Sequence, residues 1–246
     1  MSPCSTECGE DTPSITFTEL MPVTHVIFDL DGLLLDTEPL YTIANNQILA
    51  KYGKEFSWEL KRQQMGRTHD DAIKVLLKLT DLDTLVTVEE YSKDYDALLL
   101  QLFATAPLLP GAEKLVRHLH KHNIPIAICT GSADHEYKSK TSRHPDIFSL
   151  FSHCVAVSSD AEIKRGKPAP DCYMKCAERF AVQPASFSDV LVFEDAPNGV
   201  ESGLAAGMQV VMVPDPRVED THRRKATLCL ESLEFFDPSA FGLPPY

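Results

Sequence analysis

The sequence predicts an α/β fold in which a parallel sheet is joined by helical crossovers and a helical segment is inserted after the first strand. Three observations support this prediction. Short apolar runs typical of buried strands alternate with stretches of helical spacing. Polar turns rich in acids or hydroxyls directly follow three of these runs. The stretch between the first two runs has helical spacing and no convincing strand alternation.

Strands and helices are expected to alternate along the core. Six apolar segments have the length and composition of strands, namely residues 23–28, 124–129, 154–157, 190–193, 210–213 and 227–230. The helices expected among them cover residues 112–122, 170–180 and 198–206. Such alternation indicates a parallel sheet, because right-handed helical crossovers connect parallel strands. Gly207 suits the left-handed residue that ends a helix before the next strand.

The inserted segment is expected to be a small helical bundle. Two sets of apolar residues have the spacing of a helix face: Ala72, Val75, Leu76 and Leu79 in one, and Tyr91, Tyr95, Leu98, Leu99 and Leu102 in the other. Pro107, Pro110 and Gly111 close this region. An independent interaction domain is the alternative, but both ends return to neighbouring core elements, which favours a lid.

The chain is therefore expected to have three parts. These are a flexible tail at residues 1–21, a core made of residues 22–40 and 107–246, and a helical cap at residues 41–106. The tail contains neither the basic region nor the apolar region of a signal peptide. No apolar run of the sequence approaches the roughly 20 residues that a membrane span needs.

Composition limits the classes of partner. The 246 residues carry a net charge of −13, and both nucleic acids and anionic membranes require a basic surface. A phosphate substrate is still compatible with this charge, because a bound divalent cation reverses the local field. The seven cysteines are odd in number and lack CxxC spacing, so we expect no disulfide framework and no zinc site. A cytoplasmic monomer is the expectation.

Chemistry-bearing residues follow the expected strands. The candidates at strand ends are Asp29, Asp31, Thr130, Gly131, Ser132, Glu194 and Asp195, and Lys167 precedes a helix. In an open α/β sheet the carboxyl ends of the strands border the ligand crevice, so these side chains should converge. The paired acids at positions 29 and 31 must then be solvated or hold a cation.

Each candidate also has a structural interpretation. Most Asp-x-Asp pairs are turn residues, and Thr130 could cap the following helix. The Glu194 and Asp195 pair could act as an N-cap ahead of Pro197. An exposed cation is the usual fate of a residue such as Lys167.

The four ordered motifs, from the Asp-x-Asp pair to Glu194 and Asp195, resemble those of the haloacid dehalogenase superfamily and in particular its Mg²⁺-dependent phosphatases. The similarity extends from Val23 to the C-terminus. It implies a Rossmann-like parallel-sheet core with an inserted α-helical cap of the C1 type. It also implies a phosphomonoester hydrolase that acts through an aspartyl-phosphate.

The resemblance implies a role for each candidate. Asp29 is the expected nucleophile, and Asp31 the expected general acid and base. Mg²⁺ is expected to be bound by the side chains of Asp29 and Asp195 and by the backbone carbonyl of Asp31. Glu194 is expected to be a further ligand or to orient a metal-bound water. The expected phosphoryl-binding residues are Thr130, Gly131, Ser132 and Lys167.

A small phosphorylated metabolite is the implied substrate, with pseudouridine 5′-phosphate first and sugar phosphates or glycerol phosphate as alternatives. A phosphosugar mutase is less expected, because relatives of that kind tend to carry a His where this chain has Tyr41. A dehalogenase would not need Asp31 or Mg²⁺. A non-enzymatic phospho-receiver module would not need the cap. Candidate specificity residues in a cap turn are Gly66, Arg67, Thr68 and His69.

Three further clusters have structural explanations. His118, His120 and His122 lie on one expected helix. The pair His118 and His122 has the spacing of zinc ligands, but no third ligand is evident. Cys172 and Cys176 are expected to be small buried apolar groups. The basic segment of residues 140–144, from Lys140 to His144, could be a solvated turn or could lie at the substrate entrance.

Overall fold

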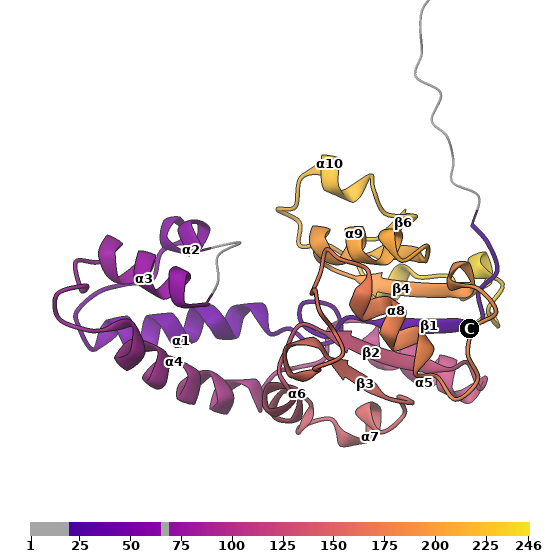
Figure 1. Ribbon diagram of the computed structural model, residues 1–246, viewed down its shortest axis with the longest axis horizontal. Helices are drawn as coiled ribbons and strands as arrows, with labels where there is room; N and C mark the ends of the chain where they lie inside the picture. The colour runs from indigo at the N-terminus through magenta and orange to yellow at the C-terminus, as the bar shows by residue number, and fades with distance from the viewer. Residues whose placement is uncertain (1–19, 65–68) are drawn as a thin grey trace, which may run out of the picture.

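The computed structural model describes residues 20–64 and 69–246 and contains a six-stranded, wholly parallel sheet (Figure 1). The strands are β1 (His25–Phe28), β2 (Ile126–Thr130), β3 (Cys154–Ala156), β4 (Val190–Glu194), β5 (Gln209–Met212) and β6 (Leu228–Cys229). Their order across the sheet is β3-β2-β1-β4-β5-β6. The predicted α/β fold is confirmed, and each strand begins and ends within two residues of its expected bounds.

The strand residues alternate between two apolar cores because successive side chains of a strand point to opposite faces. On β1, Val26 and Phe28 belong to one core and Ile27 to the other. The face that contains Ile27 is covered by α8 (Asp171–Glu178) and α9 (Pro197–Ala205). The opposite face is covered by α5 (Ala112–Lys121) and the C-terminal segment. The central strands β1, β2 and β4 are fully buried as a result, as is typical of parallel sheets.

Two short helices follow the second strand, and one precedes the last. They are α6 (Asp134–Thr141), α7 (Pro145–Phe148) and α10 (Asp220–Arg223). The predicted inward face of α5 is confirmed, since Leu115, Val116 and Leu119 are fully buried. Gly207 has a φ of +78°, as expected for the residue that ends α9 before β5.

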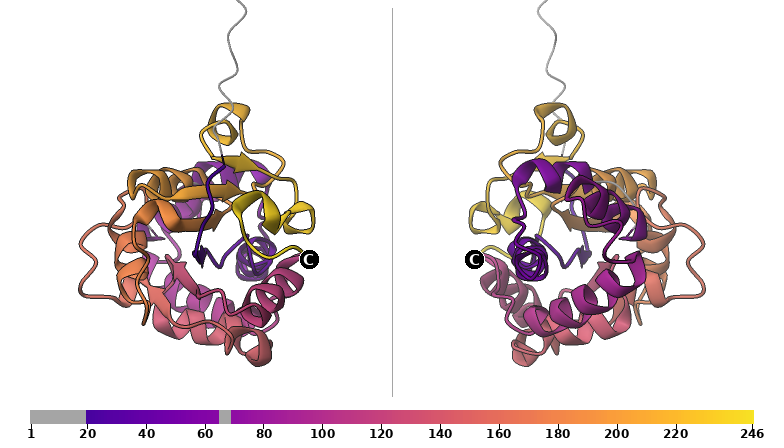
Figure 2. Two further views of the ribbon diagram at one scale, coloured as in Figure 1. Left: turned by 90° about the vertical axis from the view of Figure 1, so that its right-hand side faces the viewer. Right: turned by 90° about the vertical axis from the view of Figure 1, so that its left-hand side faces the viewer.

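The segment between β1 and β2 is helical, as predicted. It contains α1 (Glu38–Ala50), α2 (Trp58–Gln64), α3 (His69–Leu79) and α4 (Val88–Phe103), which we call the helical insert. The insert lies at one end of the sheet, and the C-terminus lies at the opposite end (Figures 1 and 2). Its first helix begins at Glu38, earlier than the expected start at residue 41. Pro39 follows Glu38 in the first turn, where a proline costs no hydrogen bond.

One predicted helix face of the insert is only partly correct, because Leu76 is buried but the centre of the buried face lies one position away. Leu79 is 51% exposed, whereas Ile73, Leu76 and Leu77 of the same helix are buried. Both sets of positions have helical spacing, so periodicity does not decide between them, and contacts with the neighbouring helices do. In α4 the buried residues are Tyr91, Tyr95, Leu99 and Phe103, which agrees with three of the five expected positions. The two others, Leu98 and Leu102, are partly buried.

The basic segment of residues 140–144 is not simply a solvated turn, because several of its side chains contact the core. Lys140 is buried. Arg143 donates to the backbone carbonyl of Thr105 at 3.0 Å, and a ring nitrogen of His144 lies 3.0 Å from the carbonyl oxygen of Ala106. These contacts fasten the chain that returns from α4 to the core.

Part of the expected tail, residues 1–19, lies outside the described residues. At its end, Met21 exchanges two hydrogen bonds with the side chain of Gln209, which tie the chain to the first residue of β5. Within the described ranges, none of the helices combines the length and the apolar character needed to cross a bilayer. The five cysteines in these ranges are all unpaired.

Candidate active site

The polar residues predicted from the sequence converge at the carboxyl ends of β1, β2 and β4. They border a cavity of about 360 Å³. Seven of the eight predicted residues line it: Asp29, Asp31, Gly131, Ser132, Lys167, Glu194 and Asp195. Thr130 is the exception, because it is fully buried as the last residue of β2. It is not a helix cap, since the N-cap of α6 is Ala133.

Lys167 joins two of the acids. Its ammonium lies 2.5 Å from Oδ1 of Asp29 and 2.7 Å from Oε1 of Glu194, and it also donates to the carbonyl of Cys129 at 3.1 Å. Its side chain is only 11% exposed. The exposed-cation interpretation is therefore wrong: this lysine is a buried counter-charge for two carboxylates.

The electrostatics show a crowded set of negative groups. Burial raises the pKa of Asp29 to about 7, even though the adjacent Lys167 ammonium opposes the rise. Burial and the carboxylate of Glu194 likewise raise the pKa of Asp195 well above its usual range. Burial by itself would lower the pKa of Lys167, but the carboxylates of Asp29 and Glu194 outweigh it and raise that pKa. The site is therefore short of positive charge.

Asp31 is held by four donors. Its Oδ1 accepts from the hydroxyl of Thr37 at 2.8 Å, and the ammonium of Lys140 lies 2.7 Å from the same oxygen. Its Oδ2 accepts from the hydroxyls of Ser132 at 2.9 Å and Thr130 at 3.3 Å. The carboxylate is thus oriented by four donors from three parts of the chain, and its side chain is 22% exposed.

Glu194 is more completely enclosed. One of its oxygens accepts from Lys167 and from the hydroxyl of Tyr173 at 2.5 Å. The other accepts from the backbone N–H groups of Asp195 at 3.1 Å and Ala196 at 3.3 Å. The residue is therefore not a side-chain cap of α9, whose N-cap is Ala196. It fixes the turn that carries Asp195.

Two glycines allow these acids to approach the backbone. A Cβ atom on Gly199 would lie 1.8 Å from Oε1 of Glu194, so only glycine fits the first turn of α9 there. A Cβ atom on Gly32 would lie 2.5 Å from Oδ2 of Asp195, and Gly32 has a φ of +77°. Gly32 and Gly199 are therefore required because a carboxylate packs directly against the backbone at each position.

A divalent metal fits this arrangement. Ligand oxygens of Asp29, Glu194 and Asp195 all lie within 4.8 Å of one another. The donor set consists of carboxylate oxygens, which hard cations such as Mg²⁺ prefer. The raised pKa values of Asp29 and Asp195 indicate that one lysine does not balance the acids, so a cation would be stabilised there.

Several cavity residues were not predicted from the sequence. The sequence predicts Lys140 only as part of a basic segment without an assigned role, and it predicts no role for Thr37 or Tyr173. Glu38 and Tyr41 of α1 and Glu136 of α6 also line the cavity. No local signal distinguishes Lys140 or Tyr173, because their contacts with Asp31 and Glu194 join different segments of the chain.

A second cavity of about 390 Å³ lies within the helical insert. It shares Glu38 and Tyr41 with the cavity at the strand ends, which we call the catalytic cavity from the reaction proposed below. Its other lining residues include Asn45, Gln64, His69 and Tyr95. Of the four candidate specificity residues, His69 therefore lies in this cavity. The other three, Gly66, Arg67 and Thr68, lie outside the described residues.

The remaining clusters have structural roles. A ring nitrogen of His118 lies 2.8 Å from the carbonyl oxygen of Pro244, which fastens the C-terminal segment to α5. Cys172 and Cys176 are fully buried in the core between α8 and the sheet, as expected.

Comparisons with known proteins agree with this geometry. A sequence model of haloacid dehalogenase-like hydrolases matches residues 23–207. The chain is 46% identical to (DL)-glycerol-3-phosphatase 2 of Arabidopsis thaliana, over 91% of this chain and 93% of that protein. It is 47% identical to the probable pseudouridine-5′-phosphatase of Drosophila melanogaster, over 92% of this chain and 97% of that protein. A solved family hydrolase from Deinococcus radiodurans, with bound phosphate and sodium, shares the fold at a TM-score of 0.75 and 24% identity, over 92% of this chain and 99% of that one.

Proposed function

The chain belongs to the haloacid dehalogenase-like hydrolases and is a phosphoric monoester hydrolase of small phosphorylated metabolites, and we propose that its substrate is pseudouridine 5′-phosphate. One observation carries the assignment of the reaction to this site. In a single cavity, a buried lysine pairs with Asp29 while Asp31 and Asp195 stand beside it. Such a constellation supplies a nucleophile, a proton donor and the charge needed to neutralise a phosphoryl group.

The chemistry follows from these groups in two steps. A carboxylate oxygen of Asp29 attacks phosphorus, and the bond from phosphorus to the ester oxygen breaks. Asp31 donates its proton to the departing oxygen. In the second step Asp31 removes a proton from a water that attacks the aspartyl-phosphate, so that phosphate leaves and Asp29 is regenerated. Lys167, Ser132 and the turn at Gly131 hold the phosphoryl oxygens. Thr130, buried at the end of β2, accepts a hydrogen bond from the backbone N–H of Ser132 and so helps to fix this turn.

Asp29, Asp195 and the backbone carbonyl of Asp31 are the groups we expect to hold Mg²⁺. When bound, the ion offsets the repulsion between the attacking carboxylate and the phosphate. Glu194 orients this set, since both of its oxygens already accept two hydrogen bonds each. Because the expected metal contact of Asp31 is its backbone carbonyl, its side chain is not needed as a metal ligand and can act in proton transfer.

Leaving-group chemistry tests the role of Asp31. Asp31→Asn should slow the release of an alcohol from an alkyl phosphate by about 10²–10⁴-fold, because the amide has no acidic proton to give. Release of p-nitrophenolate, which departs without a proton, should be slowed far less. Single-turnover measurements with excess enzyme and saturating Mg²⁺ follow this step directly. Equal losses for the two substrates would contradict the assignment.

The second cavity supports a nucleoside as the leaving group. Its volume of about 390 Å³ lies in the range of sites that enclose drug-sized ligands, and a three-carbon glycerol would leave much of it empty. Aromatic and amide side chains line it, including Tyr95 and Gln64. These can contact the face and edge of a base. Glycerol phosphate is the second candidate, because of the Arabidopsis relative.

A substrate panel tests the proposal. Pseudouridine 5′-phosphate, uridine 5′-phosphate, glycerol 3-phosphate and several sugar phosphates should be compared by kcat/KM with and without Mg²⁺. We expect the highest kcat/KM for pseudouridine 5′-phosphate and loss of turnover after Mg²⁺ is removed. A higher kcat/KM for glycerol 3-phosphate would replace the proposed substrate, and no turnover of any phosphomonoester would refute the reaction itself.

Filling the second cavity should separate the two substrate candidates. Ala72 lines this cavity from α3. Ala72→Leu should lower kcat/KM for a nucleoside 5′-phosphate by about 10-fold or more, the effect of a misfit worth roughly 1.4 kcal/mol. Glycerol 3-phosphate, whose leaving group is much smaller than a nucleoside, should be hydrolysed at an unchanged rate. Equal effects on both substrates would contradict the assignment of the cavity to the leaving group.

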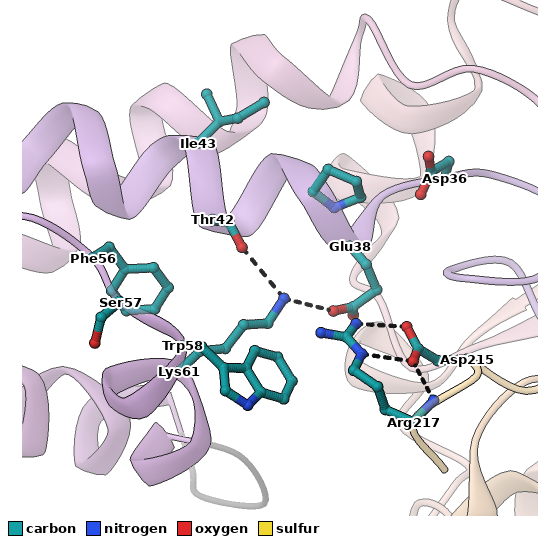
Figure 3. Close-up of a pocket in the computed structure, with 11 residues that line it drawn as sticks. Asp36, Glu38, Thr42, Ile43, Phe56, Ser57, Trp58, Lys61, Asp215 and Arg217 are labelled. Atoms are coloured by element: carbon teal, nitrogen blue, oxygen red, sulfur yellow. Dashed lines mark hydrogen bonds and ion pairs between the residues drawn. The ribbon is translucent and has the colours of Figure 1, made fainter.

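We also propose that the helical insert acts as a cap over the core. A contact between the two is formed by Arg217, which lies in the loop after β5. Its guanidinium stacks on the ring of Trp58 with its centre 4.3 Å from the ring centroid, and it is paired with Asp215. Figure 3 shows this contact beside the cavity that separates α1 and α2 from the loop. One stacking contact at a partly exposed site is weak enough to break during opening and closing.

Closure should be visible in the fluorescence of Trp58, the one tryptophan of the chain. Adding Mg²⁺ and beryllofluoride, which mimics a phosphoryl group on a carboxylate, should change the emission because the ring moves relative to Arg217. The same addition to Asp29→Asn should have no effect, since that variant lacks the carboxylate. If neither the emission nor hydrogen exchange over residues 38–103 changes in the wild type, closure is contradicted.

A further inference from the structure

We infer that Lys140 is a positioning residue for Asp31, holding the carboxylate of the general acid and base in the orientation that proton transfer requires. The inference rests on the proposed function. The side chain of Lys140 is only 1% exposed. Lysine is almost never so deeply buried without a partner, so the location of its charge needs an explanation.

The ammonium of Lys140 contacts two cavity residues. It lies 2.7 Å from Oδ1 of Asp31 and donates to the hydroxyl of Ser132 at 2.7 Å. Ser132 in turn donates to the other oxygen of Asp31 at 2.9 Å. Lys140, Ser132 and Asp31 therefore form a closed ring of contacts that restrains rotation of the carboxylate. Among the described residues, Lys140 is the one cation paired with Asp31, as Lys167 is with Asp29.

The ammonium of Lys140 also contacts the helical insert. It lies 4.2 Å from the centroid of the Phe103 ring in α4 and 3.4 Å from the hydroxyl of Tyr41 in α1. These two helices are the ones through which the chain leaves the core and returns to it. Lys140 itself belongs to α6 of the core. It therefore touches the acid and both connections of the insert at once.

A purely structural role does not account for this charge. A buried ion pair contributes little net stability, and an apolar side chain of similar volume packed between the rings would serve as well. The partners of the cation are instead Asp31 and Ser132, which both line the catalytic cavity. Without the Lys140 ammonium, the Asp31 carboxylate would be held only by neutral hydroxyl donors. A negatively charged phosphate could then displace it. A displacement of about 1 Å at such a group can cost about 10²-fold in rate.

The test compares two leaving groups in single turnover with saturating Mg²⁺. For Lys140→Met, we expect release of the alcohol from pseudouridine 5′-phosphate to fall by about 10–100-fold and release of p-nitrophenolate to fall much less. If the wild type prefers glycerol 3-phosphate, that alkyl phosphate takes the place of the nucleotide. Lys140→Arg keeps a cation beside Asp31 and should recover part of the alkyl-phosphate rate. Lys138→Met, on the exposed side of the same helix, is the matched control and should behave as the wild type.

A double-mutant cycle shows whether the lysine acts through Asp31. In the Asp31→Asn background, adding Lys140→Met should leave both rates almost unchanged. Equal losses for the two leaving groups, an effect confined to KM, or a full Lys140→Met effect in the Asp31→Asn background would each overturn the inference. Should Lys140→Met fail to fold, Lys140→Gln, which keeps a hydrogen-bond donor without the charge, undergoes the same comparison. A wild type inactive on every phosphomonoester would instead refute the proposed function.

Discussion

Asp29→Asn should abolish turnover, with a fall in kcat on the order of 10⁴-fold or more, as for the loss of other catalytic nucleophiles. The amide cannot attack phosphorus, and it also binds a divalent cation more weakly than a carboxylate. Steady-state hydrolysis of p-nitrophenyl phosphate at saturating Mg²⁺ measures the loss. This substrate needs no proton for its leaving group, so the result does not depend on the general acid.

Two controls accompany the Asp29 variant. Asp36→Asn changes an acid a short distance along the chain that does not line the catalytic cavity, and it should keep nearly full activity. Mass spectrometry of the quenched wild type should find a phosphoryl group on the peptide that contains Asp29 and none on the corresponding peptide of the variant. Substantial residual kcat, or a phosphoryl group on another residue, would assign the nucleophile elsewhere.

Lys167→Met should damage both catalysis and folding. The lysine is the buried counter-charge of Asp29 and Glu194, and its removal leaves two carboxylates in a site that already raises the pKa of Asp29. Removing one partner of a buried ionic cluster typically costs about 3–5 kcal/mol of stability. Loss of its interaction with the phosphoryl group should lower kcat by about 10²–10³-fold.

Denaturant unfolding and single-turnover kinetics measure these two effects separately. Lys164→Met, in the same loop but exposed, is the matched control and should change neither quantity. The two leaving groups should be slowed equally by Lys167→Met, in contrast to Asp31→Asn, because the lysine stabilises the phosphoryl group and not the departing oxygen. A stable and active Lys167→Met variant would show that the cluster needs no ammonium.

Much of the core could be predicted because its signals are local. A parallel strand is buried on both faces, so it is recognisable as a short apolar run, and the polar turn after it marks its carboxyl end. That is why the sequence predicts that Asp29, Asp31 and Asp195 lie together. The ordered motifs indicated the family, because their residue types and their order along the chain resemble those of its phosphatases.

The helical insert was harder to predict in detail. In α3 the positions 72, 75, 76 and 79 and the positions 73, 76, 77 and 80 are spaced identically, and the second set is the buried one. Spacing identifies a helix, but the inward face depends on which neighbouring helices are present. Its first helix also begins at Glu38, so the insert contributes Glu38 and Tyr41 directly to the catalytic cavity.

The sequence by itself determined the α/β class, the helical insert, the family and the residues at the strand ends, since each depends on a run of neighbouring residues. Only the tertiary structure decided that Lys167 is buried between two acids, that Glu194 is enclosed by donors on both oxygens, and that Lys140 reaches Asp31. These contacts join residues far apart in the sequence: Lys140 and Asp31 are 109 positions apart, yet their charged atoms lie 2.7 Å apart. Pairing of this kind follows from the fold as a whole. A buried charge requires a counter-charge nearby in space, and that partner need not be nearby in the sequence.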